Sequence, residues 1–245
     1  MMSDALLRER ICRLARSMFD RGLTGGASGN ISARTEDGGL LVTPTGSSMG
    51  DLDPARLSRF DAGGRLVSGD APTKEMALHS AFYETRARVG AVVHLHSTHS
   101  VALSMLPGTD PESALPPLTA YSIMRLGRVK LLALSMLPGT DPESALPPLT
   151  AYSIMRLGRV KLLPYFRPGD PAMGEAVRGL AGRRSAVLLA NHGPVVAGKD
   201  LEAAVYAAEE LEETARLALL TRGSDPVMLT DAQIRDLVTK FEVDW

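Results

Sequence analysis

The sequence has little of several features that would each indicate a specialised class of protein. It contains one cysteine, Cys12, so neither an internal disulfide nor a cysteine-rich metal site can form. Its 27 lysines and arginines against 28 aspartates and glutamates give a formal net charge of -1, which does not favour a nucleic-acid-binding face. No apolar run reaches the roughly 18 residues of a membrane span. Charged residues between Arg8 and Arg13 also interrupt the region where a secretory signal would lie. We therefore expect a cytoplasmic protein that binds neither nucleic acid nor membrane.

Two common nucleotide-binding motifs are also missing. The sequence contains neither GxGxxG nor GxxxxGK[ST]. It therefore lacks the motif that best indicates a dinucleotide-binding protein and the one that best indicates a P-loop protein. Its 245 residues, 44% hydrophobic and 22% charged, have the composition of an ordinary globular protein. We expect residues 1–245 to form one domain.

An internal duplication interrupts the second half of the chain. Residues 102–132 and 133–163 are identical over 31 positions. Stacked repeat architectures diverge between copies and run to three or more units, so we interpret this tandem as a recent duplication or a sequence artefact, not as architecture. Chain continuity predicts that the helix passing through Ser100 uses the first copy and that the strand before Pro164 uses the second. About 31 residues between them should then form an added loop or a poorly packed hairpin.

The remaining pattern predicts a mixed or antiparallel sheet with helices on both faces. Helices are expected at residues 4–22, 73–86, 200–222 and 230–241, with Thr73, Asp200 and Thr230 at the start of the last three. Strands are expected at 25–35, 37–46, 64–69, 91–97 and 185–193 and at the GRVKLL segment, with a helical turn at 51–61. Strands outnumber crossover helices, and tight turns link several of them, which disfavours a doubly wound parallel sheet.

The histidines indicate a metal site. All five lie in three short segments, TKEMALH, HLHSTHS and LLANHG. On a strand, His94 and His96 would point to the same side, and two imidazoles at that spacing can both reach a tetrahedral Zn²⁺. His192 follows an apolar strand at a corner, and Glu75 could supply an oxygen ligand or a general base. We interpret His79 and His99 as supporting residues, not ligands.

A phosphate site is the second expected component. Gly29 and Asn30 in ASGN, and Thr45, Gly46 and Ser47 in TPTGSS, lie in glycine-punctuated turns whose backbone N–H groups can surround an anion. Thr73 and Lys74 lie at an expected helix N-terminus, where the helix dipole favours a phosphate. Their proximity to Glu75 in the sequence suggests a single site.

These segments, in this order, resemble the class II aldolase/adducin family over nearly the whole chain apart from the extra copy. The markers are SGNIS, TPTG, the Glu75 helix, HLHS and ANHG. A closer resemblance, carried by GDAPTKEMALH, PPLTAYSIMRLG and PYFRPGDPAMGEAV, is to the 3-oxo-tetronate 4-phosphate decarboxylases. The resemblance implies a three-layer α/β/α sandwich and a homotetramer with active sites at subunit interfaces.

The resemblance also implies roles for individual residues. One Zn²⁺ per subunit would be held by His94, His96 and His192, with Glu75 as the acid/base beside the metal. Asn30, Gly46, Thr73 and Lys74 correspond to the family's phosphate pocket. Tyr121 and Tyr152, one in each copy, are the candidates for a mobile catalytic tyrosine.

The implied activity is decarboxylation of a 3-oxo-tetronate 4-phosphate to dihydroxyacetone phosphate and CO₂. The family's epimerases carry Asp where this chain has Glu75, which argues against epimerisation. Three alternatives stay open: an aldolase of the fuculose-phosphate type, a dehydratase of a phosphorylated ketose, and a metal-free binding module like that of adducin.

Overall fold

The computed structural model describes residues 3–106, 161–180, 182, 184–224, 226–227 and 229–241. Tyr121, Tyr152 and the expected excursion of the chain lie outside the described residues. The positions of the two tyrosines therefore stay predictions.

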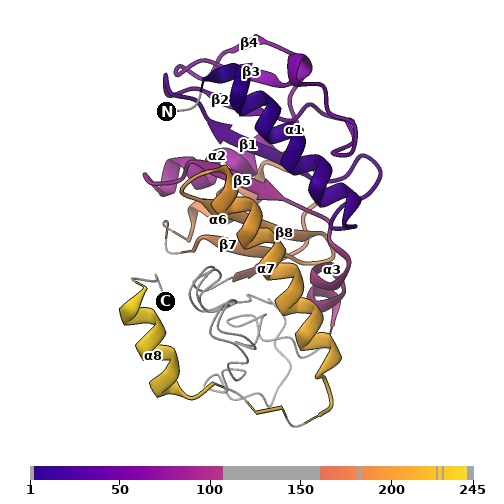
Figure 1. The fold of residues 1–245 in the computed structure, drawn as a ribbon, viewed down its shortest axis with the longest axis vertical. Coiled ribbons are helices and arrows are strands. Elements are labelled where there is room, and N and C mark those ends of the chain that lie inside the picture. Colours follow the sequence, from indigo (N-terminus) through magenta and orange to yellow (C-terminus); the bar gives the residue numbers. More distant parts are fainter. Residues whose placement is uncertain are drawn as a thin grey trace.

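The described residues form one mixed sheet in the order β4-β3-β2-β1-β5-β8-β7-β6 (Figure 1). Every neighbouring pair is antiparallel except β6 and β7, which are parallel. This confirms the predicted mixed, largely antiparallel sheet. The strands are β1 Asn30–Arg34, β2 Leu40–Val42, β3 Ser58–Phe60, β4 Leu66–Ser68, β5 Ala91–His94, β6 Lys161–Leu163, β7 Ala186–Leu189 and β8 Gly193–Gly198.

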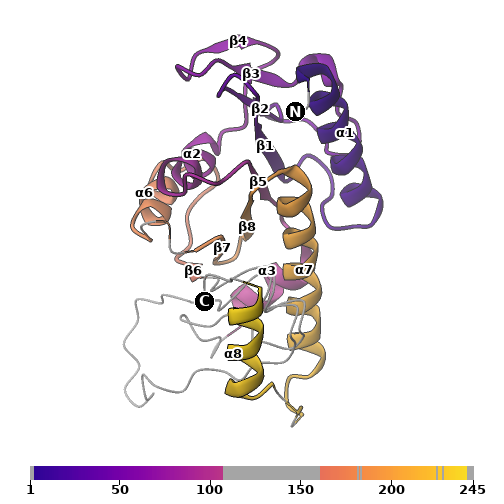
Figure 2. The same cartoon turned by 60° about the vertical axis from the view of Figure 1, so that its left-hand side comes forward.

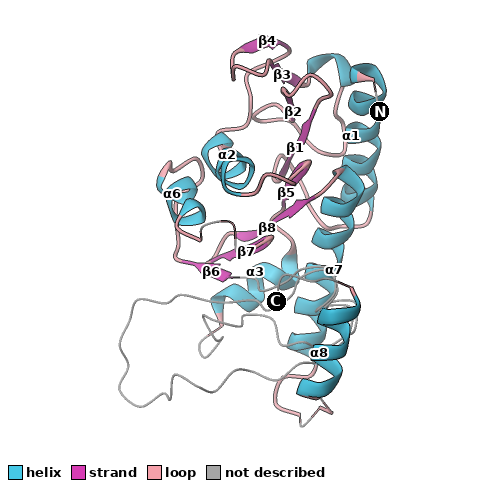
Figure 3. Ribbon diagram, turned by 90° about the vertical axis from the view of Figure 1, so that its left-hand side faces the viewer, coloured by secondary structure: helices cyan, strands magenta, loops and turns pink. Residues whose placement is uncertain are grey.

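Helices cover both faces of this sheet, as Figure 3 shows with the sheet between them. On one face lie α1 (Asp4–Asp20), α3 (Thr98–Met105) and α7 (Leu201–Leu220), and on the other α2 (Met76–Thr85) and α6 (Ala172–Arg178). The core is divided accordingly. Val93 and Val196 pack with α1 and α7, while the alternating Val92 and Val195 pack with α2 and α6, as the period of two along a strand requires. The three-layer α/β/α sandwich is confirmed.

Two further helical elements follow the predicted pattern. The turn η1 (Pro54–Arg56) begins after Asp53, whose side chain accepts a hydrogen bond from the Ala55 N–H. The C-terminal helix α8 (Asp231–Lys240), seen in Figure 2, starts with the capping box of Thr230 and Gln233. Within the part of the chain that the structure describes, none of the helices combines the length and apolar character of a membrane span.

The start of α2 differs from the prediction. Thr73 was expected to cap this helix, but α2 begins at Met76 and its N-cap is Glu75, whose side chain caps nothing. The Thr73 N–H donates to the Thr43 carbonyl, and Pro72 bridges to Pro44, so the chain is still extended at Thr73. Strand-like pairing thus delays the helix by two residues and frees the Glu75 carboxylate for other contacts.

Three elements were missed from the sequence: β3, β8 and α6. The segment 185–193 was interpreted as one strand, whereas β7 ends at Leu189 and a turn leads into β8. Gly193 and Pro194 begin β8, and because both residue types disfavour interior strands, strand propensity does not predict it. The strand nevertheless lies inside the sheet, between β5 and β7, where its apolar side chains are covered on both faces.

The two copies of the duplication contribute to different elements. The helix α3 runs into the first copy and ends at Met105, and β6 is formed by the last residues of the second copy. This agrees with the expectation from chain continuity. The described core therefore uses the outer ends of the tandem.

Removing one copy should leave the fold intact. Deleting 102–132 or 133–163 yields the same 214-residue sequence, and the connection between Met105 and Lys161 shortens from 55 to 24 residues. Because the entropy cost of closing a connection rises slowly with length, we expect stabilisation by up to about 0.7 kcal/mol. Thermal unfolding followed by circular dichroism, with the full chain as control, measures this. A shortened chain that fails to fold would contradict it.

Candidate metal centre

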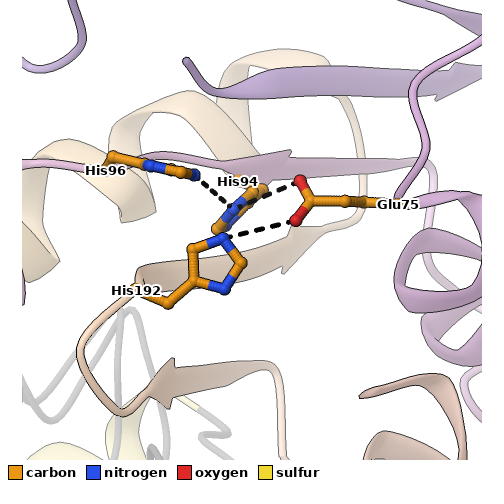
Figure 4. A group of neighbouring side chains, drawn as sticks. All are labelled: Glu75, His94, His96 and His192. Atoms are coloured by element: carbon orange, nitrogen blue, oxygen red, sulfur yellow. Dashed lines mark hydrogen bonds and ion pairs between the residues drawn. The ribbon is translucent and has the colours of Figure 1, made fainter. Parts of the chain in front are cut away.

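Four side chains from separate parts of the chain converge on one point (Figure 4). Glu75 precedes α2, His94 ends β5, His96 follows it by two residues, and His192 lies in the turn between β7 and β8. One nitrogen or oxygen atom from each lies within 4.8 Å of the others. The four residues predicted from the sequence are thus brought together, in a group that could hold one metal ion.

Backbone contacts between β5 and β8 explain how His192 reaches the other histidines. The Leu95 N–H donates to the Pro194 carbonyl at 3.1 Å. Gly193 has φ of 148°, and a Cβ at this position would lie 2.1 Å from the Leu95 carbonyl oxygen. Only glycine permits this close approach, so Gly193 allows the turn that carries His192 to lie beside the end of β5.

The hydrogen bonds of the imidazoles leave their ring nitrogens directed at one another. His94 Nδ1 donates to the Pro194 carbonyl at 2.9 Å, so its Nε2 carries the lone pair. That Nε2 lies 3.1 Å from Nε2 of His96 and 3.4 Å from Oε2 of Glu75. His192 Nε2 lies 3.3 Å from Oε1 of Glu75.

Several of these buried polar atoms have no hydrogen-bond partner among the described residues. They are Oε1 of Glu75 and both ring nitrogens of His192. An unsatisfied buried polar group costs roughly 1–3 kcal/mol. A cation coordinated by the four side chains would satisfy Oε1 and one imidazole nitrogen. Three imidazoles and a carboxylate also form a donor set typical of zinc proteins. The residues therefore fit a metal ion.

Burial and mutual proximity set the charges of the cluster. Burial raises the pKa of Glu75, but the neighbouring His192, His94 and Asn30 lower it by more, so its pKa lies well below the ordinary value. Burial, assisted by the adjacent imidazoles, lowers the pKa of His94 to about 4 and also lowers that of His96. At neutral pH the carboxylate is therefore ionised and these two rings are neutral, as metal ligands must be.

A pocket adjoins the cluster and contains every residue predicted for the phosphate site. Its lining includes Glu75 and His96 from the cluster. Gly29 and Gly46 adopt φ of 78° and 72°, which lets their turns present backbone N–H groups. Lys74 is the one lysine or arginine among the described lining residues. The other lining residues are Ala27, Ser28, Asn30, Pro44, Thr45, Ser47, Thr73 and Pro168.

The two remaining histidines lie outside the cluster. His79 is buried against Asn30 and Ser32. His99 lies at the start of α3, and its Nδ1 is 2.8 Å from Oε1 of Glu212 on α7. Both placements agree with a supporting role. Sequence reasoning missed Pro168, which reaches the pocket from after β6, and the partners of His79. The spacing of Glu75, His79 and Tyr83, four residues apart on a helix, was a signal for the latter.

Residues 9–219 match the family described as Class II Aldolase and Adducin N-terminal domain. The chain is 43% identical over 232 residues to 3-oxo-tetronate 4-phosphate decarboxylase from Escherichia coli strain K12, covering 94% of each protein. The enzyme of that name from Haemophilus influenzae is 40% identical over 236 residues, covering 96% of this chain and 98% of that protein. Among solved structures, YgbL from Klebsiella pneumoniae superposes with a TM-score of 0.81 at 38% identity, covering 97% of this chain and all of that one.

Replacing His94 or His192 by alanine should remove bound metal. Each change deletes one of the three imidazole donors in the cluster, and the two imidazoles that remain hold an ion more weakly. Elemental analysis of purified protein measures the metal content per chain. His99→Gln serves as the matched control, because it alters a histidine outside the cluster. Unchanged metal content in either alanine variant would remove that residue from the ligand set.

Proposed function

The chain belongs to the class II aldolase and adducin family, and from this premise we propose that it is a zinc-dependent decarboxylase. Its substrate is a 3-oxo-tetronate 4-phosphate, and its products are dihydroxyacetone phosphate and CO₂. The observation that carries the proposal is the convergence of Glu75, His94, His96 and His192 beside a pocket of anion-binding turns. The activity named for the 43%-identical relative supports the choice of substrate. A binding module without metal chemistry would have no need for four such donors in one place.

Binding of the phosphate is assigned to the turns that line the pocket. Backbone N–H groups around Gly29 and Gly46, the hydroxyl groups of Thr45 and Thr73, and the charge of Lys74 form a cationic, donor-rich surface. The N-terminus of α2 adds a partial positive charge beside them. Holding the phosphate on C4 fixes where C1, C2 and C3 of the substrate lie relative to Glu75. Binding energy at the phosphate is therefore used to orient the reacting carbons.

Cleavage of the bond between C1 and C2 leaves its electron pair on C2, conjugated with the C3 ketone. The three histidines and Glu75 would hold a zinc ion, which supplies Lewis-acid stabilisation of negative charge on the ketone oxygen. The bond electrons remain with the three-carbon fragment while C1 departs as CO₂. One proton must then be added at C2 to complete the product.

Glu75 is the group assigned to deliver this proton. It is the one carboxyl side chain among the described residues that line the pocket. Because its low pKa leaves it ionised at rest, it takes a proton from solvent in each turnover and passes it to C2. Conversion of a carboxylate into CO₂ consumes one proton, so the balance closes.

The proposal extends to features of the whole protein. We assign the chain one domain, one zinc ion per subunit, a homotetrameric assembly with interfacial active sites, and a cytoplasmic location. Tyr121 or Tyr152 is assigned as the mobile tyrosine that completes the site. The family resemblance of the motifs around these positions supports these assignments.

Release of CO₂ from a 3-oxo-tetronate 4-phosphate by the purified, zinc-loaded chain tests the proposed reaction. We expect CO₂ and dihydroxyacetone phosphate in equal amounts, with loss of activity after chelation and recovery on adding zinc. Parallel incubation of dihydroxyacetone phosphate with aldehydes tests for aldol addition. Zinc-dependent aldol addition without any CO₂ release would replace the decarboxylase with an aldolase.

Glu75→Gln should lower turnover at least roughly 10²-fold, the scale expected on removing a general acid/base. Bound zinc should persist, because the three histidines are unchanged. Steady-state kinetics and elemental analysis give the two quantities. Glu84→Gln makes the same chemical change on the exposed face of α2, where Glu84 pairs with Arg178, and should leave turnover unaltered. Unimpaired turnover in Glu75→Gln would exclude Glu75 from proton transfer.

A further inference from the structure

Behind Glu75, an unbroken chain of hydrogen bonds runs away from the pocket between β1 and α2. Asn30 Nδ2 lies 2.7 Å from Oε2 of Glu75, and Asn30 Oδ1 lies 2.5 Å from Nε2 of His79. Nδ1 of His79 lies 2.6 Å from the Ser32 hydroxyl, which lies 2.9 Å from the Tyr83 hydroxyl. All five side chains are buried. Beyond Glu75 and Asn30, the chain uses three polar side chains, His79, Ser32 and Tyr83, that belong to neither the metal cluster nor the pocket lining.

The geometry of a strand against a helix produces this arrangement. Asn30 and Ser32 are two positions apart on β1, a rise of about 6.6 Å. Glu75, His79 and Tyr83 are spaced four residues apart along α2 and its N-cap, a rise of about 6 Å per step. Because the two repeats nearly match, each polar residue of the strand lies between two of the helix.

The direction of each hydrogen bond follows from the contact at the Glu75 end. Asn30 Nδ2 donates to Oε2 of Glu75, so the amide oxygen of Asn30 faces His79. An amide oxygen can only accept, so His79 Nε2 must carry a proton.

The remaining bonds are then determined. Burial, with the nearby His94, lowers the pKa of His79 to about 3, so the ring is neutral and its Nδ1 bears a lone pair. Ser32 therefore donates to Nδ1 of His79 and accepts from Tyr83. Burial raises the pKa of Tyr83, which keeps its hydroxyl protonated as a donor.

We infer that His79 is a positioning residue, which holds the Asn30 amide in the orientation that donates to Glu75. Reversing the amide would place its oxygen against the carboxylate and its NH₂ group against the N–H of His79, so both contacts would become repulsive. His79 thereby fixes the carboxylate at the edge of the pocket without touching substrate. For its effect on turnover, this inference rests on the decarboxylase function proposed above.

The tautomer of His79 tests the inference without any substrate. In the full-length chain labelled with nitrogen isotope at its five histidines, we expect His79 to show a protonated Nε2 and an unprotonated Nδ1. His94 provides the internal reference, because its Nδ1 donates to the Pro194 carbonyl and it should show the opposite pattern. The ring signals that are missing from the spectrum of the His79→Gln variant are thereby assigned to His79. A protonated Nδ1 on His79 would overturn the inference.

Kinetics separate positioning from simple support of the fold. His79→Leu should lower kcat roughly 10- to 100-fold, with KM and zinc content little changed, because a small displacement of the acid/base disturbs chemistry more than binding. His79→Gln, which retains a donor and an acceptor, should recover part of the loss. Leu78→Ala is the matched control, because it opens a cavity at the neighbouring fully buried position of α2. An equal fall in kcat for Leu78→Ala would overturn a specific role for His79.

A double-mutant cycle identifies the route of the effect. If His79 acts through Asn30, then His79→Leu should cause little further loss of kcat once Asn30 is alanine. Independent, multiplicative losses would overturn the inference. Failure of the unmodified, zinc-loaded chain to release CO₂ would refute the proposed function instead, and the tautomer of His79 would still decide the inference.

Discussion

Burial of the Glu75 carboxylate is the constraint on which the site depends. Only 6% of this residue is exposed, and a charge removed from water must be matched by donors or cations. Its neighbours come from three other elements: Asn30 of β1, His94 of β5 and His192 of the turn between β7 and β8. The carboxylate therefore meets these neighbours only when α2 has docked onto the assembled sheet.

The two faces of the sheet bury different kinds of side chain. The face covered by α1, α3 and α7 holds the larger, almost entirely apolar cluster, which includes Ile31, Val93 and Val196. The face covered by α2 and α6 combines apolar contacts with the polar row of Asn30, Ser32 and His94.

The duplication leaves these arrangements untouched in the described residues. Every member of the metal cluster and the pocket lies before residue 102 or after residue 163. The tandem falls between α3 on one face and β6 at the edge of the sheet, which is an end of the strand order and not its centre. Although the tandem lies between β5 and β8 in the chain, these two strands, which support the histidines, remain paired in the sheet. The proposed catalytic tyrosine, Tyr121 or Tyr152, belongs to the duplicated segment.

The sequence alone predicted the class of the fold and the four side chains that the structure brings together. Period-two alternation predicted that His94 and His96 lie on one side, and glycine-rich turns predicted residues that line the adjoining pocket, because both patterns are local properties of the backbone. It could not predict that Glu75 lies in the turn before α2 and not within the helix, since pairing of Thr73 with Thr43 keeps the preceding chain extended. Nor could it identify β8 or the contacts of His79 with Asn30 and Ser32. These depend on partners 47 to 49 residues away for His79, and only tertiary packing brings such partners within hydrogen-bonding distance.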